Sequence, residues 1–252
     1  MKAKLSWIVP EPPRKVAKDN LSLDLTWDVV SKAFENVVVD KDYYDYIKHK
    51  DVIVVGPADY LRGQGRGWWI DEFDIVVRVN RSFPVNEEDF EDLGSRTDIR
   101  YHNACTRENE GGPLHLDNPQ IENLEYVSSV FPRHLDYFDN DINKLEEELK
   151  DSSVKLHCHS DIEQYITLHH MMETRPNVGI GAILDLVNYR PKRLHIAGFT
   201  FFSSEYIDSY QGRRKEIPSE YQNNMTNNHA QGPQRDMIKL LDENVIFIDL
   251  DD

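Results

Sequence analysis

Short apolar runs alternate with amphipathic stretches along most of this 252-residue chain. Residues 51–56, DVIVVG, form a β-branched run that ends in glycine, which is typical of a buried parallel strand. Further segments of this kind predict strands at residues 73–80, 97–103, 125–131, 155–159, 193–199 and 244–250. Because helical patterns separate these strands, the sequence predicts a Rossmann-like α/β fold, with a mostly parallel sheet and helices on both faces.

The helical patterns are amphipathic. In residues 234–244, Met237, Leu240 and Leu241 recur at helical spacing. Other helices are predicted at residues 26–37, 40–50, 142–150, 161–172 and 179–189. Residues 1–50 are polar and mixed, so we expect them to form a helical N-terminal extension, and residues 51–252 to form one Rossmann-like domain.

Charge and cysteine content narrow the setting of the protein. Lys and Arg number 29 against 45 Asp and Glu, a net charge of −16, which argues against nucleic acid or an anionic membrane as the main partner. A local cationic pocket for an anionic small molecule remains compatible with that net charge. No apolar run reaches the roughly 18 residues of a membrane span. The two cysteines, Cys105 and Cys158, favour a reducing compartment, so we expect a cytoplasmic protein.

A glycine-rich segment, residues 56–67, follows the strand 51–56. Glycine lets backbone N–H groups approach a phosphate or a ribose closely. The segment lacks the Lys-Ser/Thr pair of a P-loop and the spacing of the dinucleotide fingerprint. A plain turn explains these glycines equally well, so the segment alone does not define a site.

Three other segments carry candidate chemistry. Asn80 ends the strand 73–80, where an amide can read a base or a ribose, or can simply cap a turn. Residues 175–181, RPNVGIG, open a helix and could hold a phosphate, or form an ordinary loop. His229 precedes the helix 234–244 and could remove a proton from a hydroxyl, or be structural.

The joint order of these segments resembles the sialyltransferase family. Four stretches carry the resemblance: 52–83 to the long sialyl motif of animal-type enzymes, 94–103 to the stretch after it, 175–202 to the short motif and 227–241 to the very short motif. The resemblance spans residues 51–249 and implies a glycosyltransferase domain, in a soluble form of bacterial or viral style.

This resemblance implies transfer of sialic acid or a related keto-acid sugar, with inversion, from a CMP-sugar donor to a hydroxyl of a glycan or glycolipid acceptor. His229 is the implied general base, and Tyr206 and Tyr210 the implied hydrogen-bond donors to the departing phosphate. The implied donor-binding residues are Gly56, Ala58, Asp59, Asn80, Asn103, Arg175, Asn177, Val178 and Gly179. The donor is a substrate, and the scheme needs no metal and no other cofactor.

Some positions depart from the family pattern. Pro57 stands where the family usually has Asn, and Val178 where it has a hydroxyl residue, so a phosphate contact at Val178 must come from the backbone N–H. The cysteines that link the long and short motifs in animal enzymes are replaced by Val52 and Pro191. A nucleotide-binding module that has lost catalysis is therefore an alternative. A methyltransferase is a weaker one, because Asn80 stands where its acidic residue would be.

The acidic and histidine pairs do not indicate a metal site. The three Asp-x-Asp sequences, at residues 40–42, 139–141 and 249–251, are expected to be helix caps or surface residues. His157 and His159 alternate on a predicted strand, so their side chains share a face. Further ligands with zinc spacing are not evident beside them.

Overall fold

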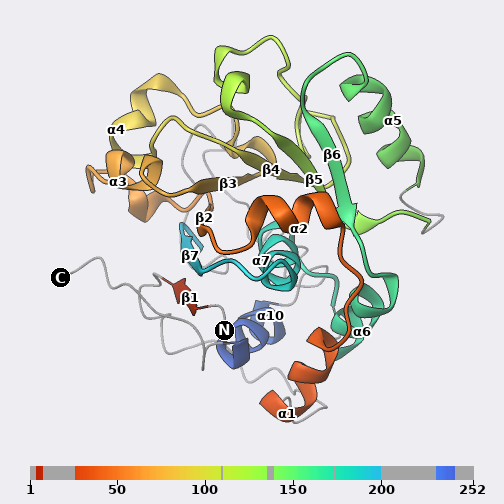
Figure 1. Ribbon diagram of the computed structural model, residues 1–252. Coiled ribbons are helices and arrows are strands. Elements are labelled where there is room, and N and C mark those ends of the chain that lie inside the picture. The colour runs from red at the N-terminus through yellow and green to blue at the C-terminus, as the bar shows by residue number, and fades with distance from the viewer. Residues whose placement is uncertain are drawn as a thin grey trace, which may run out of the picture.

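The apolar runs of the sequence form a seven-stranded parallel sheet in the computed structural model of the protein (Figure 1). The structure describes residues 4–7, 26–108, 110–134, 139–172, 174–199 and 231–241. The strands are β1 (Lys4–Trp7), β2 (Asp51–Val55), β3 (Ile75–Val79), β4 (Ile99–His102), β5 (Tyr126–Pro132), β6 (Lys155–His159) and β7 (Arg193–Ala197). Their order is β1-β7-β2-β3-β4-β5-β6, and every neighbouring pair is parallel.

Helices connect these strands much as the periodicity predicts. The α-helices are α1 (Trp27–Val30), α2 (Lys41–Ile47), α3 (Gly67–Asp71), α4 (Phe90–Leu93), α5 (Asp139–Leu149), α6 (Ile162–Met172), α7 (Val178–Asn188) and α10 (Gln231–Leu240). Short 3-10 helices are η1 (Ser31–Phe34), η2 (Asp59–Leu61), η3 (Asn80–Ser82), η4 (Glu87–Asp89) and η5 (Pro119–Asn123).

Alternate residues of the central strands enter two apolar layers. Val52 and Val54 of β2 belong to one buried cluster, whereas Ile53 and Val55 belong to the other. The first layer includes side chains of α2, α7 and α10, and the second includes those of α3 and α4. Figure 1 shows where these helices lie along the sheet. The predicted Rossmann-like α/β arrangement, with helices on both faces, is confirmed.

The N-terminal region contributes more to the sheet than its composition suggests. Residues 4–7 form β1, which pairs with β7, and the sequence did not predict this strand. The predicted strand at residues 244–250 lies outside the described residues. The division at residue 50 stays a prediction, although β1 and the buried side chains of α2 both contact elements that follow it.

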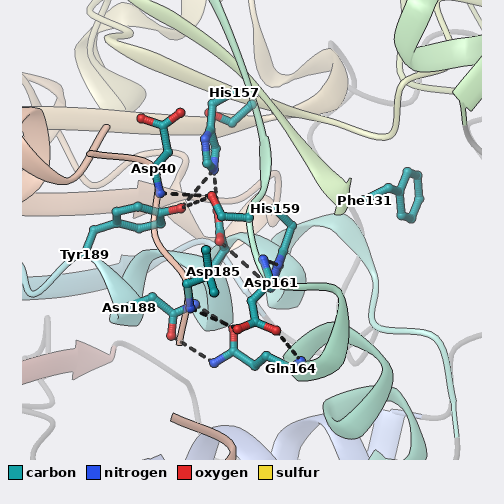
Figure 2. A network of polar contacts seen from close by, with 12 residues as sticks. Asp40, Phe131, His157, His159, Asp161, Gln164, Asp185, Asn188 and Tyr189 are labelled. Atoms are coloured by element: carbon teal, nitrogen blue, oxygen red, sulfur yellow. Dashed lines mark hydrogen bonds and ion pairs between the residues drawn. The ribbon is translucent and has the colours of Figure 1, made fainter. Parts of the chain in front are cut away.

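A buried carboxylate ties α7 to the sheet. Asp185 is fully buried, and its Oδ2 accepts a hydrogen bond from the Tyr101 hydroxyl at 2.7 Å and lies 3.2 Å from His157 Nε2. His159 Nε2 lies 3.9 Å from the other carboxylate oxygen. Figure 2 shows both histidines converging on Asp185. His157 and His159 therefore point to the same face of the sheet, as the sequence predicted, and α7 packs on that face.

The same polar network reaches the segment before β2. The Tyr43 ring of α2 stacks on His157, with ring centroids 3.9 Å apart. Gln164 of α6 donates from Nε2 to the Ala33 carbonyl and to Asn188 Oδ1, both at 2.9 Å. Figure 2 shows Gln164 and Asn188 below the histidines. The polar contacts thus join α2, η1, α6 and α7 to one side of the sheet.

The network keeps Asp185 ionised. Burial alone would raise the pKa of this carboxyl, but His159, His157 and the Tyr101 hydroxyl together outweigh burial and lower it. A carboxyl with a lowered folded-state pKa stabilises the fold above its unfolded pKa of about 3.9. That contribution is lost as the pH falls through the lower folded-state value.

We predict that Asp185→Ala destabilises the protein strongly. The Tyr101 hydroxyl and the His157 ring would lose their buried acceptor, at about 1–3 kcal/mol for each unsatisfied group. Chemical denaturation should therefore show an unfolding free energy lower by at least about 2 kcal/mol. The matched control is Asp45→Ala, which removes an exposed carboxylate paired with Lys41 and Lys48 and should leave the midpoint nearly unchanged. Equal midpoints for the two variants would show that the network adds no stability.

Candidate functional site

The strand order reverses beside β2. Strands β3 to β6 follow on one side of β2, whereas β7 lies on its other side. In open parallel sheets, ligands bind outside the carboxyl ends of the strands at such a switch point. Gly56 follows β2 and Gly198 follows β7, so these two glycines mark the switch point.

The segments that follow β2 and β7 are joined by backbone hydrogen bonds at this point. Gly56 N–H donates to the Ala197 carbonyl at 2.7 Å, and Ala58 N–H donates to the Gly198 carbonyl at 3.1 Å. A Cβ on Gly56 would lie 2.3 Å from the Gly198 oxygen, and a Cβ on Gly198 would lie 2.3 Å from the Gly56 oxygen. Gly198 also has a φ of +76°, which glycine adopts without strain. Both positions therefore require glycine.

The N-terminal turn of α7 lies beside the switch point. A Cβ on Gly179 would lie 2.1 Å from Cε1 of Phe199, and the same ring reaches within 2.9 Å of a Cβ on Gly56. Asn177 caps α7, because its Oδ1 accepts from the Ile180 N–H at 3.0 Å. The Asn177 N–H donates to Oε1 of Gln234 at 2.8 Å, which joins α10 to this turn.

Asn80 and Asn103 form a second part of the same edge. They follow the adjacent strands β3 and β4, and Asn80 Oδ1 accepts from the Asn103 N–H at 3.1 Å. Asn80 has a φ of +45°, and Asn103 Oδ1 accepts from the Cys105 N–H at 3.0 Å. Both side chains thus stabilise turns, which for Asn80 was one of the two roles that the sequence left open. Gly198, Gly56, Asn80 and Asn103 follow four neighbouring strands, in sheet order.

Two polar side chains add to the electrostatics of this edge. The Tyr60 hydroxyl accepts a hydrogen bond from the Gly198 N–H at 2.8 Å, and burial raises the pKa of Tyr60 to about 12, so the phenol is neutral. The Arg175 guanidinium lies over the Phe131 ring, 5.9 Å from its centroid, two residues before the α7 cap. A cation and a helix N-terminus together favour an anionic ligand.

A comparison with family models identifies the chain. The model described as glycosyltransferase family 29 (sialyltransferase) matches residues 13–178, more than half of the 252 residues. The chain belongs to glycosyltransferase family 29. Its matched part runs through the glycine-rich segment and the asparagine pair to the first residue of α7. No curated protein matches the sequence of this family 29 glycosyltransferase.

Solved structures agree with this assignment at the level of the fold. A mammalian sialyltransferase structure is similar with a TM-score of 0.51 and 14% identity, covering 93% of this chain and 81% of that one. A mammalian sialyltransferase in complex with Gal-beta-1-3GalNAc-ortho-nitrophenol is similar with a TM-score of 0.50 and 16% identity, over the same shares of the two chains. At such identity the likeness shows the fold.

The structure joins some of the predicted donor-binding residues in two separate groups at the carboxyl edge of the sheet. Gly56 and Ala58 meet β7, Gly179 meets the same aromatic ring as Gly56, and the two asparagines meet each other. Asp59 begins η2 and Val178 begins α7. The predicted catalytic residues Tyr206, Tyr210 and His229 lie outside the described residues. Sequence reasoning missed Gln234 and the pairing of Gly56 with Gly198, since neither has a local signal.

The acidic pairs serve as helix starts where the structure describes them. Asp40 caps α2 by accepting from the Tyr43 N–H at 2.9 Å, and residues 139–141 form the first turn of α5. Residues 249–251 lie beyond the described part. Within the described ranges, no group of three or more His, Cys, Asp or Glu side chains could hold a metal ion. Among the same residues, no helix has the length and apolar character to cross a membrane.

We predict that Gly56→Ala disrupts the switch point of the glycosyltransferase. The added Cβ would meet a backbone oxygen at 2.3 Å, which side-chain motion cannot relieve. We expect a loss of about 3 kcal/mol or more of unfolding free energy, at the upper end of overpacking effects, together with loss of glycosyl transfer. Gly63→Ala is the control: its φ is +76° but nothing lies within 4 Å of its Cβ, so only the left-handed strain of about 1–2 kcal/mol remains. A stable and active Gly56→Ala variant would contradict the assignment.

Proposed function

We propose that this glycosyltransferase moves sialic acid, or a related keto-acid sugar, from a CMP-sugar to a hydroxyl of a glycan or glycolipid, with inversion. The proposal rests mainly on one observation. Among the described residues of the long and short motif stretches, Gly56, Gly179 and Gly198 lie at the switch point between β2 and β7, where the two segments meet at glycine. Backbone without side chains lets a nucleotide approach closely.

The first turn of α7 is the proposed phosphate site. An α-helix leaves the first backbone N–H groups without partners inside the helix. Asn177 satisfies that of Ile180, so we assign those of Val178 and Gly179 to the phosphate. This assignment needs no hydroxyl at Val178, which departs from the family pattern at that position. Arg175 adds a positive charge close to the same turn, and Asn80 with Asn103 would hold the nucleoside and the sugar.

Transfer from CMP requires two kinds of assistance. Departure of the nucleotide builds a transition state like an oxocarbenium ion, so donors to the departing phosphate stabilise it. On the other face of the sugar, a base removes the proton of the acceptor hydroxyl, and this oxygen bonds to the anomeric carbon as the bond to CMP breaks, which inverts the configuration. We assign Tyr206 and Tyr210 to the phosphate and His229 to the acceptor. The acceptor class agrees with the glycan analogue held by one similar mammalian enzyme.

Two described residues support His229 as the base. His229 precedes α10 by two residues, and Gln234 of that helix is bonded to the start of α7. His102, which directly precedes Asn103, is fully buried, and burial together with the Arg100 charge lowers its pKa to about 3. Its Nε2 lies 2.9 Å from the Gly112 carbonyl, so His102 is occupied in holding a turn.

A panel of nucleotide sugars tests the donor. We expect nucleotide release from CMP-sugars, and not from UDP- or GDP-sugars, with and without glycan acceptors. Chelation with EDTA should leave turnover nearly intact, because the Asp-x-Asp sequences at residues 40–42 and 139–141 are helix starts. Preferred release from a UDP- or GDP-sugar would reject the donor. Activity lost in EDTA and restored by manganese would reject metal independence alone.

We predict that His229→Ala lowers transfer by about 10²–10⁴-fold, the usual contribution of a general base. CMP affinity should change little, because the base faces the acceptor. The wild-type rate should fall as the pH drops through about 6–7, where an ordinary His gains a proton and can no longer accept one. His170→Ala, on the exposed side of α6, is the matched control and should transfer at the wild-type rate. Equal rates for the two variants would remove His229 from the mechanism.

A further inference from the structure

Two arginines lie side by side on adjacent strands of the sheet, close to its carboxyl edge. Arg78 of β3 and Arg100 of β4 are register partners, and their exposed fractions are 1% and 0%. Arg78 donates to the Leu93 carbonyl at 2.6 Å and to the Thr97 hydroxyl at 3.0 Å, so it holds the end of α4. Arg100 has a different set of partners, and these lead to the proposed donor site.

Arg100 joins the end of β3 to the turn that follows β4. Its Nε donates to the Asn80 carbonyl at 2.8 Å, its Nη1 to the Pro113 carbonyl at 2.8 Å and its Nη2 to the Gly111 carbonyl at 2.9 Å. The planar guanidinium suits this use, because its donors point in fixed directions. One side chain therefore sets the spacing between Asn80 and residues 111–113.

His102 completes the hold on that turn. Its Nε2 lies 2.9 Å from the Gly112 carbonyl, and since a carbonyl can only accept, Nε2 carries the proton. Arg100 and His102 thus bind three successive carbonyls, those of residues 111–113. The fit is close, because a Cβ on Gly111 would lie 2.2 Å from Asn103 Oδ1.

We infer that Arg100 is a positioning residue for donor binding. By holding the Asn80 carbonyl it maintains the left-handed turn at Asn80, whose Oδ1 receives the Asn103 N–H. By binding the carbonyls of the turn at residues 111–113, Arg100 keeps the Gly111 backbone packed against the side-chain amide of Asn103. Because Arg100 is fully buried, we assign it no direct contact with sugar or nucleotide. This inference rests on the proposed function, in which the two asparagines hold the donor.

Calorimetry with CMP on a pair of variants tests the inference. Arg78→Ala and Arg100→Ala each remove a fully buried guanidinium that binds backbone carbonyls, so their structural losses are matched. We expect Arg100→Ala to weaken CMP binding by about 10- to 100-fold, the effect of a small misplacement in a site. Arg78→Ala should stay near wild type, and methylguanidine should restore part of the lost affinity in the Arg100 variant. Equal losses in the two variants would overturn the inference.

If the alanine variants do not fold, Arg78→Lys and Arg100→Lys carry the same test. Lysine keeps the charge, but its donors all lie on one nitrogen, so it cannot reproduce the planar fork whose three nitrogens reach the carbonyls of Asn80, Gly111 and Pro113. Arg100→Lys should raise the KM for the CMP-sugar and leave that for the acceptor unchanged, whereas Arg78→Lys should change neither. Unchanged donor KM in Arg100→Lys would overturn the inference.

Hydrogen exchange without nucleotide separates this inference from the proposed function. Peptides covering residues 80–83 and 110–113 should exchange faster in the Arg100 variants than in the Arg78 variants. If the wild-type protein binds no cytidine nucleotide, the proposed function fails, and the exchange result still shows whether Arg100 holds these segments. Equal exchange in both sets of variants would show that Arg100 does not hold residues 80–83 and 110–113 in place.

Discussion

The buried, ionised carboxylate of Asp185 constrains how α7 packs against β4, β6 and α2. A charge without access to water is stable only while its hydrogen-bond donors stay in place. Those donors come from β4 and β6, and the same group of side chains reaches α2 through the stacked Tyr43 ring. Gly179 lies six residues earlier on the same helix, about 9 Å along its axis. Contacts nearly two turns away therefore position the end of α7 at the switch point, together with the bond between Asn177 and Gln234.

The local pattern of apolar and polar residues was sufficient to predict the layers of the fold, but not every strand or every buried side chain. The β-branched runs and amphipathic helices predicted the central sheet, because burial imposes a period of two on strands and 3.6 on helices. β1 escaped prediction because KLSW is four residues long and carries no extended alternation. Arg78 and Arg100 lie in apolar strands, and nothing local shows that their charges are buried. Their bonding partners follow from the register and from turns up to 20 residues away.

The candidate site was predicted where its residues end strands or begin a helix. Asn80, Asn103 and the start of α7 fall at the carboxyl edge because parallel strands bring those ends together. The contact between Gly56 and Gly198 joins segments 142 residues apart, which no spacing rule can detect. The role of Gln234 in joining α10 to α7 is equally non-local. The sequence therefore predicted which residues lie at the carboxyl edge, but it did not predict the long-range backbone contacts that form this edge.

The place of β1 in the sheet has a consequence for how the chain acquires its structure. β1 comes first in the sequence, but its neighbour β7 begins at residue 193. A chain made from its N-terminus thus keeps residues 4–7 without a pairing partner until nearly all of the other strands exist. Contacts between such distant segments form slowly, because a long loop must close before they can form. We therefore expect the first strand to dock late, after β7 has paired with β2.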